Sequence, residues 1–203
     1  IFAPSSTLQK ILKDAVENSF NRITIDGDMS TNDTVLLLAN GNSGIKLEEE
    51  TNAVQREFTD AVNAVCSCLA RKCVTDGEKV SKFVKVRIKG AKDSKSALKV
   101  ARCIANSLLV KTSWYGSDPN WGRVVDAAGY AKVGLSFEKI TMFYNETPVL
   151  SKGTPLIENK ENWKKIVSSD EFTVTLDLNM GRAEGEIWSN DLSEEYVNFN
   201  KSE

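Results

Sequence analysis

Carboxylates, hydroxyls and lysines are the side chains with which this chain could do chemistry, because its 203 residues include no histidine. Without histidine, a Ser-His-Asp triad, a Cys-His pair and a His-ligated metal site are all excluded. Any general base must be a carboxylate, a lysine, a tyrosine, or an amine that is not part of a side chain. Three polar loops carry such groups.

The first loop, residues 26–34, joins two apolar segments and consists mainly of small polar side chains. Its carboxylates are Asp26, Asp28 and Asp33, and Ser30 is one of its hydroxyls. One interpretation is a tight turn in which these side chains bond to nearby backbone groups. The other is a functional loop that holds a hydroxyl nucleophile or a Mg²⁺ or Ca²⁺ ion, although the carboxylate spacing differs from that of an EF-hand.

The second loop, residues 75–82, follows a predicted helix and contains Gly77, which allows the backbone to turn sharply. Glu78 could therefore project from a loop that rigid elements hold on both sides, a common place for functional residues. A carboxylate there could bind the ammonium group of a substrate, or act as an acid or base. The alternative is a solvated loop in which Glu78 pairs with Lys79 or Lys82.

The third loop, residues 113–123, places two tryptophans and a tyrosine within a turn that contains Gly and Pro. Such large aromatic side chains should pack against a ligand, another chain or the core. Arg123 follows Asn120 by about one helical turn and could bind a carboxylate with its guanidinium group. The alternative is a helix-capping turn that tryptophan anchors, and the sequence leaves both interpretations open.

The composition narrows the class of protein further. A net charge of −2 and a pI near 5.5 lack the basic footprint of a nucleic-acid-binding protein. Cys66, Cys68, Cys73 and Cys103 lack the paired spacing of a zinc site, so we expect reduced cysteines and a cytoplasmic protein. No apolar run approaches the ~20 residues of a membrane span. Because the chain starts at Ile1 rather than Met, we expect a processed, cleaved or incomplete N-terminus.

The elements that must position the three loops are helices and strands in alternation. Apolar spacing predicts helices over residues 5–20, 48–74, 94–107, 119–131 and 158–168. Short apolar or alternating runs predict strands over 23–25, 34–39, 83–88, 140–144, 147–150, 172–178, 184–188 and 196–200. The predicted fold class is therefore mixed α/β (α+β). The expected division falls near Gly90, giving parts 1–90 and 91–203.

Several strings of residues, taken in order, resemble the ornithine acetyltransferase family of arginine biosynthesis. These strings are 19–22 leading into 25–34, then 76–78, 109–112, 117–123 and 191–193, followed by 195–197 and Asn200. The resemblance spans essentially the whole chain, and residues 30–34 and 118–123 are its most specific parts.

In that family a precursor cleaves itself before a threonine, and the new N-terminal threonine of the β chain is the nucleophile. The resemblance implies that this chain is the β chain and that the nucleophile is not present in it, because it lies just upstream of Ile1. It also implies that residues 1–90 form part of a layered N-terminal-nucleophile-like acyltransferase core shared with an α chain. Residues 91–203 would be a smaller C-terminal α/β lobe with a tail that returns toward the active site.

The implied reaction moves an acetyl group from N-acetylornithine to glutamate through an acetyl-threonine intermediate. Residue by residue, Glu78 and Asn200 match substrate-binding residues of the family. A structural role is expected for Asp118, Asn120 and Arg123. No metal and no cofactor are implied, and acetyl-CoA is left open as an alternative acetyl donor.

The implied partner is an α chain from the same precursor, which would supply the oxyanion-stabilising donors, in an α2β2 assembly. The expected location is the cytoplasm, or the mitochondrial matrix if the source is a fungus. Two other functions stay open: a related N-terminal-nucleophile amidase or aminopeptidase, and a non-catalytic subunit.

Overall fold

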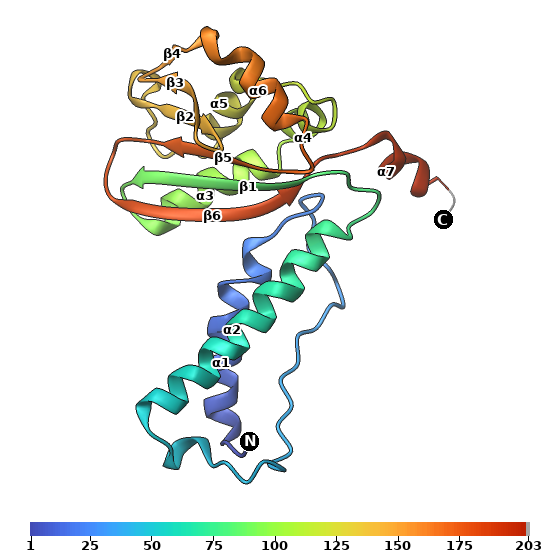
Figure 1. Cartoon of the computed structure of the whole chain (residues 1–203), viewed down its shortest axis with the longest axis vertical. Helices are drawn as coiled ribbons and strands as arrows, with labels where there is room; N and C mark the ends of the chain where they lie inside the picture. The colour runs from blue at the N-terminus through green and yellow to red at the C-terminus, as the bar shows by residue number, and fades with distance from the viewer. Residues whose placement is uncertain (202–203) are drawn as a thin grey trace. The chain divides into compact units, whose positions relative to one another are not determined.

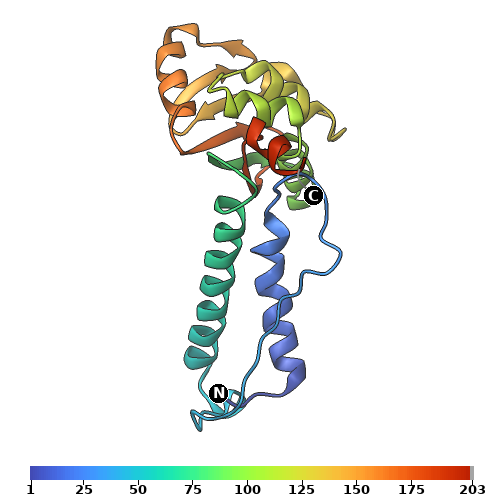
Figure 2. The same cartoon turned by 90° about the vertical axis from the view of Figure 1, so that its right-hand side faces the viewer.

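The computed structural model describes residues 1–201, which divide into two compact units (Figures 1 and 2). Unit 1 comprises Ile1–Ile23 and Met29–Cys73, and unit 2 comprises Thr24–Asp28 and the chain from Val74 onward. These units are defined by contacts within the chain. The predicted functional division near Gly90 stays a prediction.

Unit 1 is built on two long helices that the sequence predicts, α1 (Ser5–Glu17) and α2 (Asn52–Thr75, of which the last two residues belong to unit 2). Short 3-10 helices cover Phe20–Arg22 and Leu47–Glu49. Phe2 and Lys46 form an isolated parallel bridge. Leu47 is buried, but unit 1 also leaves several large apolar side chains exposed.

The predicted strand over residues 34–39 is wrong for this chain. These residues carry no strand assignment, and Leu36 and Leu38 are 74% and 84% exposed. A strand needs a neighbour to satisfy its backbone hydrogen bonds, and no strand of residues 1–201 pairs with this segment. The apolar run indicates a preference for a buried strand, but residues 1–201 provide no strand to pair with it.

Helix α2 buries only part of its apolar surface within residues 1–201. Cys66 and Ala70 are buried, whereas Val65 and Leu69 are 59% and 47% exposed. Helix α2 therefore has apolar side chains on two faces, and only one of them is covered within residues 1–201.

Unit 2 contains one sheet and five helices among the described residues. Its strands are β1 (Phe83–Ala91), β2 (Thr141–Tyr144), β3 (Thr147–Ser151), β4 (Thr154–Pro155), β5 (Glu171–Asp177) and β6 (Ala183–Asn190). Its helices are α3 (Ser94–Ala105), α4 (Leu108–Tyr115), α5 (Trp121–Gly129), α6 (Lys160–Val167) and α7 (Glu194–Phe199), with 3-10 turns at Phe137–Lys139 and Ile157–Asn159.

The strand order is β4-β3-β2-β5-β1-β6, with β1 and β5 parallel and every other described pair antiparallel. In β1 the side chains of Val84, Val86 and Ile88 are fully buried, as alternation predicts. Helix α3 packs on β1 and β6, and α6 contacts β2, β3 and β5 (Figure 1). This core positions the loop that precedes β1 and the segment that follows β6, and the candidate site lies in these two segments.

Helix α3 approaches β6 closely because residue 185 is a glycine. A Cβ built on Gly185 would lie 3.1 Å from the Cβ of Ala97 and 3.1 Å from the backbone nitrogen of Leu98. A larger side chain there would push the helix from the sheet.

The mixed α/β class is confirmed, and the helices and strands of unit 2 agree with the predictions in most places. The predicted strand over 196–200 is wrong, since residues 196–199 belong to α7 and Asn200 is its C-cap. Among residues 1–201, no helix combines the length and the apolar composition that crossing a membrane requires.

Candidate functional site

The loop that carries Glu78 connects the end of α2 to the start of β1. Gly77 approaches the core so closely that a Cβ built on it would lie 3.1 Å from Nδ2 of Asn190 and 3.4 Å from Cγ2 of Ile25. Lys79 has a φ of 54°, in the left-handed region. Between these two residues, Glu78 is exposed.

The carboxylate of Asp191 anchors the other end of this loop. Its Oδ1 accepts hydrogen bonds from the backbone N–H groups of Ser81 (2.9 Å) and Lys82 (3.0 Å), and its Oδ2 accepts one from the Ser81 hydroxyl. One side chain thus fixes two consecutive backbone donors that precede β1. The sequence singles out residues 191–193 as a family string but gives no sign of this role.

The C-terminal segment folds back onto the same loop through α7. Ser193 caps the helix, since its Oγ accepts the Tyr196 N–H (3.1 Å), and it also donates to the Lys79 carbonyl oxygen (2.8 Å). Glu194 and Glu195 occupy the first turn, where negative charge stabilises a helix. These features explain why the segment is a helix despite its alternating apolar residues.

The structure brings together the two residues that the resemblance singles out. Nδ2 of Asn200 donates to Oε2 of Glu78 (2.8 Å) and to the carbonyl oxygen of Tyr196 (2.9 Å). The two residues are 122 positions apart in the sequence. An exposed carboxylate and an exposed amide, whose two N–H groups make these bonds, therefore lie at a single place.

Tyr196 joins the first loop to this site. Its hydroxyl donates to Oδ2 of Asp26 (3.2 Å), and Oδ1 of Asp26 accepts the N–H of Asp28 (2.9 Å). Burial, and then the charges of Asp26, Glu78 and Asp28, raise the pKa of Tyr196 above its ordinary value. The phenol is therefore a neutral donor near pH 7, surrounded by carboxylates.

The remainder of the first loop belongs to unit 1 and forms local bonds. Ser30 Oγ accepts the N–H groups of Asp33 (2.9 Å) and Asn32 (3.3 Å). These bonds agree with the turn interpretation for residues 30–34. Within residues 1–201, no three His, Cys, Asp or Glu side chains lie where they could hold a metal ion together.

The two lysines that could have paired with Glu78 have other contacts. The ammonium group of Lys79 lies 5.8 Å from the ring centroid of Phe199. Nζ of Lys82 donates to Ser117 Oγ (2.7 Å) and to the Val167 carbonyl oxygen (2.6 Å). Burial lowers the pKa of Lys82, while Asp191 and Asp170 oppose that shift.

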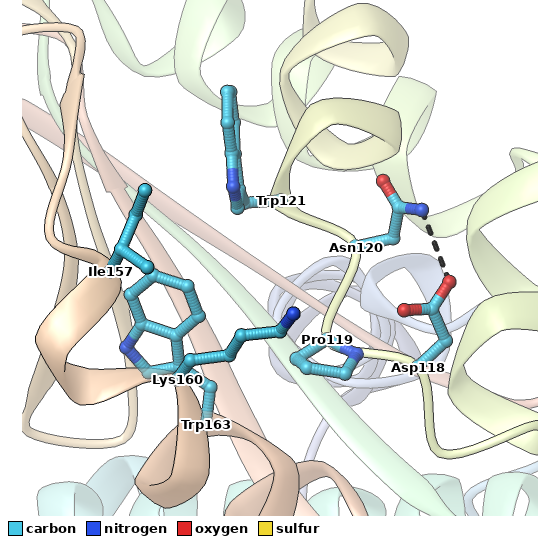
Figure 3. A pocket seen from close by; sticks show the side chains of 7 residues that line it. All are labelled: Asp118, Pro119, Asn120, Trp121, Ile157, Lys160 and Trp163. Atoms are coloured by element: carbon cyan, nitrogen blue, oxygen red, sulfur yellow. Dashed lines mark hydrogen bonds between the residues drawn. The ribbon is translucent and has the colours of Figure 1, made fainter.

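The third loop lines a pocket of about 300 Å³ (Figure 3). Figure 3 shows Trp121 above and Ile157 to the left, with Lys160 extending toward Pro119. Asp118, Asn120 and Trp163 complete the lining. Glu78 and Asn200 are not among these residues, so the pocket is separate from their contact.

The polar residues of the third loop make structural contacts. Asn120 donates to Oδ2 of Asp118 (3.0 Å), and its own Oδ1 caps α5 by accepting the Arg123 N–H (3.3 Å). Nη1 of Arg123 donates to the Leu109 carbonyl oxygen (3.0 Å). These bonds favour the capping-turn interpretation of the loop.

Known proteins match this chain over nearly its full length. A model of the ArgJ family matches residues 2–202. The arginine biosynthesis bifunctional protein ArgJ of Staphylococcus epidermidis is 43% identical over 199 residues, which cover 97% of this chain and 49% of that protein. The glutamate N-acetyltransferase of Methanocaldococcus jannaschii is 44% identical over 202 residues, which cover 96% of this chain and 49% of that protein. The chain thus spans about half the length of these curated relatives.

A solved structure agrees with the sequence comparisons. The crystal structure of the arginine biosynthesis bifunctional protein ArgJ from Bacillus halodurans matches with a TM-score of 0.92 and 32% identity, covering 99% of this chain and 95% of that one. The resemblance that the sequence strings indicate is thereby confirmed. Since the family model and these relatives all cover nearly the full chain, the chain belongs to the ArgJ family.

Proposed function

We propose that this chain is the β chain of an enzyme that transfers the acetyl group of N-acetylornithine to glutamate. The names of the relatives support a glutamate N-acetyltransferase of arginine biosynthesis. The contact between Asn200 and Glu78 is the observation in this chain that carries the proposal. A carboxylate can accept from a substrate ammonium, and a nearby amide can donate to a substrate carboxylate. Both amino-acid substrates carry these two groups.

The proposed nucleophile is a threonine just upstream of Ile1, freed as an N-terminus when the precursor cleaves itself. Its α-amine, with an ordinary pKa of about 7.7–8, would be the general base, so the reaction needs no histidine. The hydroxyl attacks the acetyl carbonyl, the amide C–N bond breaks, and ornithine leaves with the proton. The amine of glutamate then attacks the acetyl ester, which releases N-acetylglutamate and restores the hydroxyl.

An α chain is the proposed partner, in an α2β2 assembly. The exposed apolar side chains of unit 1 support this: Leu36, Leu38, Val65 and Leu69 are 47–84% exposed. Large exposed apolar side chains that gather into one patch mark an interaction surface. Residues 34–39 also offer backbone groups to which a strand of the partner could bond. The oxyanion donors are proposed to lie on the α chain, and loss of one donor would reduce kcat by ~10²–10³.

The proposal is tested with the complete enzyme, in which this chain is accompanied by the other half that its relatives contain. N-acetylornithine is supplied with isotopically labelled glutamate, and both products are quantified. We expect ornithine and labelled N-acetylglutamate in equal amounts, with little ornithine released when glutamate is omitted. Replacing N-acetylornithine with acetyl-CoA in the same assay tests the second donor.

Two results would favour the other functions. Release of acetate and ornithine at the same rate without glutamate would identify an amidase. No turnover of either donor by a correctly assembled protein would indicate a non-catalytic subunit. In both cases the acetyltransferase proposal is rejected.

A further inference from the structure

Lys111 of α4 is a fully buried lysine to which the proposed function gives no task. Its Nζ donates to the carbonyl oxygen of Asn190 (2.6 Å), to Oδ1 of Asn190 (2.6 Å) and to Oγ of Ser189 (3.1 Å). A buried ammonium group is unfavourable unless its donors are satisfied, and here three neutral oxygens satisfy them. A fully satisfied buried network of this kind orders the acceptor groups as well as the lysine.

The acceptor that matters most is the side chain of Asn190. Because Oδ1 of this amide faces Lys111, its Nδ2 is directed to the Val74 carbonyl oxygen (3.4 Å). The same Nδ2 is the closest neighbour, at 3.1 Å, of a Cβ built on Gly77. The Asn190 amide thus forms the surface on which the backbone just before Glu78 rests.

The residue after Asn190 holds the other end of the same loop. Asp191 accepts the backbone N–H groups of Ser81 and Lys82. Residues 190 and 191 therefore contact the loop on both sides of Glu78. Lys111 bonds to the backbone and the side chain of Asn190, so it fixes the point from which both contacts are made.

Two carboxylates, Asp191 and Asp26, are the charged groups that act on Lys111. Burial lowers the pKa of Lys111 from 10.5 to about 7, and these two negative charges oppose that shift. Both carboxylates also bond to the site described above, Asp191 to the loop and Asp26 to Tyr196. The buried charge is therefore surrounded by the groups that shape the site.

We infer that Lys111 is a positioning residue, whose Nζ fixes the Asn190 amide and thereby the loop that presents Glu78 to the substrate. This inference rests on the proposed function, in which Glu78 binds the ammonium group of an amino-acid substrate. Lys111 does not reach the substrate itself. Its loss should therefore change KM much more than kcat.

The test compares Lys111→Met, Glu78→Gln and the double variant in the complete enzyme. Methionine has a similar volume but no donor. We expect Lys111→Met to raise the KM for N-acetylornithine roughly ten- to hundredfold, with kcat nearly unchanged, because a displaced binding group loses its interaction. In the Glu78→Gln background the same substitution should have little further effect, because both changes remove one shared interaction.

Ser113→Ala is the matched control, because Ser113 is also a buried polar residue of α4 but its hydroxyl donates to the Val110 carbonyl oxygen of the same helix (2.7 Å). It should lower the free energy of unfolding and leave KM unchanged. If Lys111→Met does not fold, Asn190→Asp tests the inference instead. This variant keeps an acceptor for Lys111 but loses the N–H that bonds to the Val74 carbonyl oxygen, so KM should rise.

The outcomes separate the two proposals. A wild-type enzyme that transfers no acetyl group overturns the proposed function. An active wild type whose KM is unaffected by Lys111→Met or by Asn190→Asp overturns the inference on Lys111. A double variant whose KM is raised by the product of the two single effects also overturns it, because a purely structural loss would act independently of Glu78.

Discussion

The position of Glu78 depends on side chains that lie far from it in the sequence. Asn200 donates to its carboxylate, and Asp191 holds the backbone that follows it. The carboxylate itself is exposed. A change of its chemistry should therefore alter binding without altering the fold.

Glu78→Gln is expected to raise the KM for N-acetylornithine about tenfold or more, since a charge-assisted hydrogen bond contributes about 1.5–3 kcal/mol. The free energy of unfolding should change by less than about 0.5 kcal/mol. Steady-state kinetics and urea unfolding measure the two quantities. Glu138→Gln is the control, because Glu138 is also exposed and accepts a hydroxyl, that of Ser136. An equal KM for Glu78→Gln and wild type would contradict the proposed role.

The buried ammonium of Lys111 predicts a dependence of stability on pH. Its pKa falls from 10.5 to about 7 on folding, so between these values the unfolded chain binds more protons. The free energy of unfolding should then rise from pH 7 to pH 9, by up to about 1.4 kcal/mol per pH unit. The stability linked to this lowered pKa is fully present above pH 10.5, where Lys111 is neutral in both states. It is lost as the pH falls toward 7, where the folded protein must also take up the proton.

Lys111→Met should remove this rise, and urea unfolding of both proteins at pH 7, 8 and 9 measures it. Lys82 and the tyrosines are present in both proteins, so the difference between them isolates Lys111. An identical slope in the two proteins would contradict the lowered pKa of Lys111.

At the scale of elements, α7 determines whether Asn200 can reach Glu78. This helix has only six residues, so it depends on its cap and on its contacts rather than on its own propensity. Ser193 supplies both, by accepting the Tyr196 N–H and donating to the Lys79 carbonyl. Helix α7 and the loop over residues 75–82 should therefore unfold together.

Ser193→Ala is expected to destabilise α7 by about 1 kcal/mol or more, so its amide hydrogens should exchange at least roughly fivefold faster. Hydrogen exchange followed by mass spectrometry over residues 194–200 measures this. Asp93→Ala removes a comparable cap from α3 and serves as the control, because Asp93 accepts the Ser96 N–H (2.7 Å) far along the chain from α7. Unchanged exchange in α7 after Ser193→Ala would show that the cap is dispensable.

Local patterns predicted much of the fold because many elements bury one face against the core of their own unit. The helix over 5–17 and the strand over 83–91 follow their apolar spacing directly. The strand predicted over 196–200 was wrong because the side chains alternate while the cap at Ser193 selects a helix. The strand predicted over 34–39 was wrong because backbone pairing depends on a neighbour, which a local pattern does not supply.

The candidate site was predictable only in part. Glu78 and Asn200 were found through the family resemblance, but their contact over 122 positions depends on the fold. The burial of Lys111 had no signal in the sequence, because lysine is normally a surface residue and only three apolar residues precede it in α4. Asp191 and Tyr196 lie within the family strings, but their contacts with the Glu78 loop and with Asp26 depend on the fold.

At the scale of the whole molecule, unit 1 leaves several large apolar side chains exposed. Leu36 and Leu38 lie in a segment whose backbone has no strand neighbour among residues 1–201. The surface and the free backbone groups together suit a partner that contributes a strand. We expect this part of the chain to bind the α chain in the proposed assembly.

Leu36→Lys is expected to weaken that assembly strongly, because burying an unpaired charge in an apolar interface is unfavourable by several kcal/mol. Co-purification of the two chains and sedimentation of the complex measure it. Asn40→Lys adds the same charge to an exposed polar position of the same segment and should leave assembly intact. Equal recovery of complex from both variants would exclude this segment from the interface.

The contact between Glu78 and Asn200 also sets the time at which the site can first exist. A ribosome that adds about 5–20 residues per second needs roughly 6–24 s to synthesise the 122 positions that separate them. Strands β5 and β6, which flank β1 in the sheet, are themselves made late in that interval. The substrate-binding pair forms only after Asn200 has emerged, so substrate binding becomes a late property of each newly made molecule.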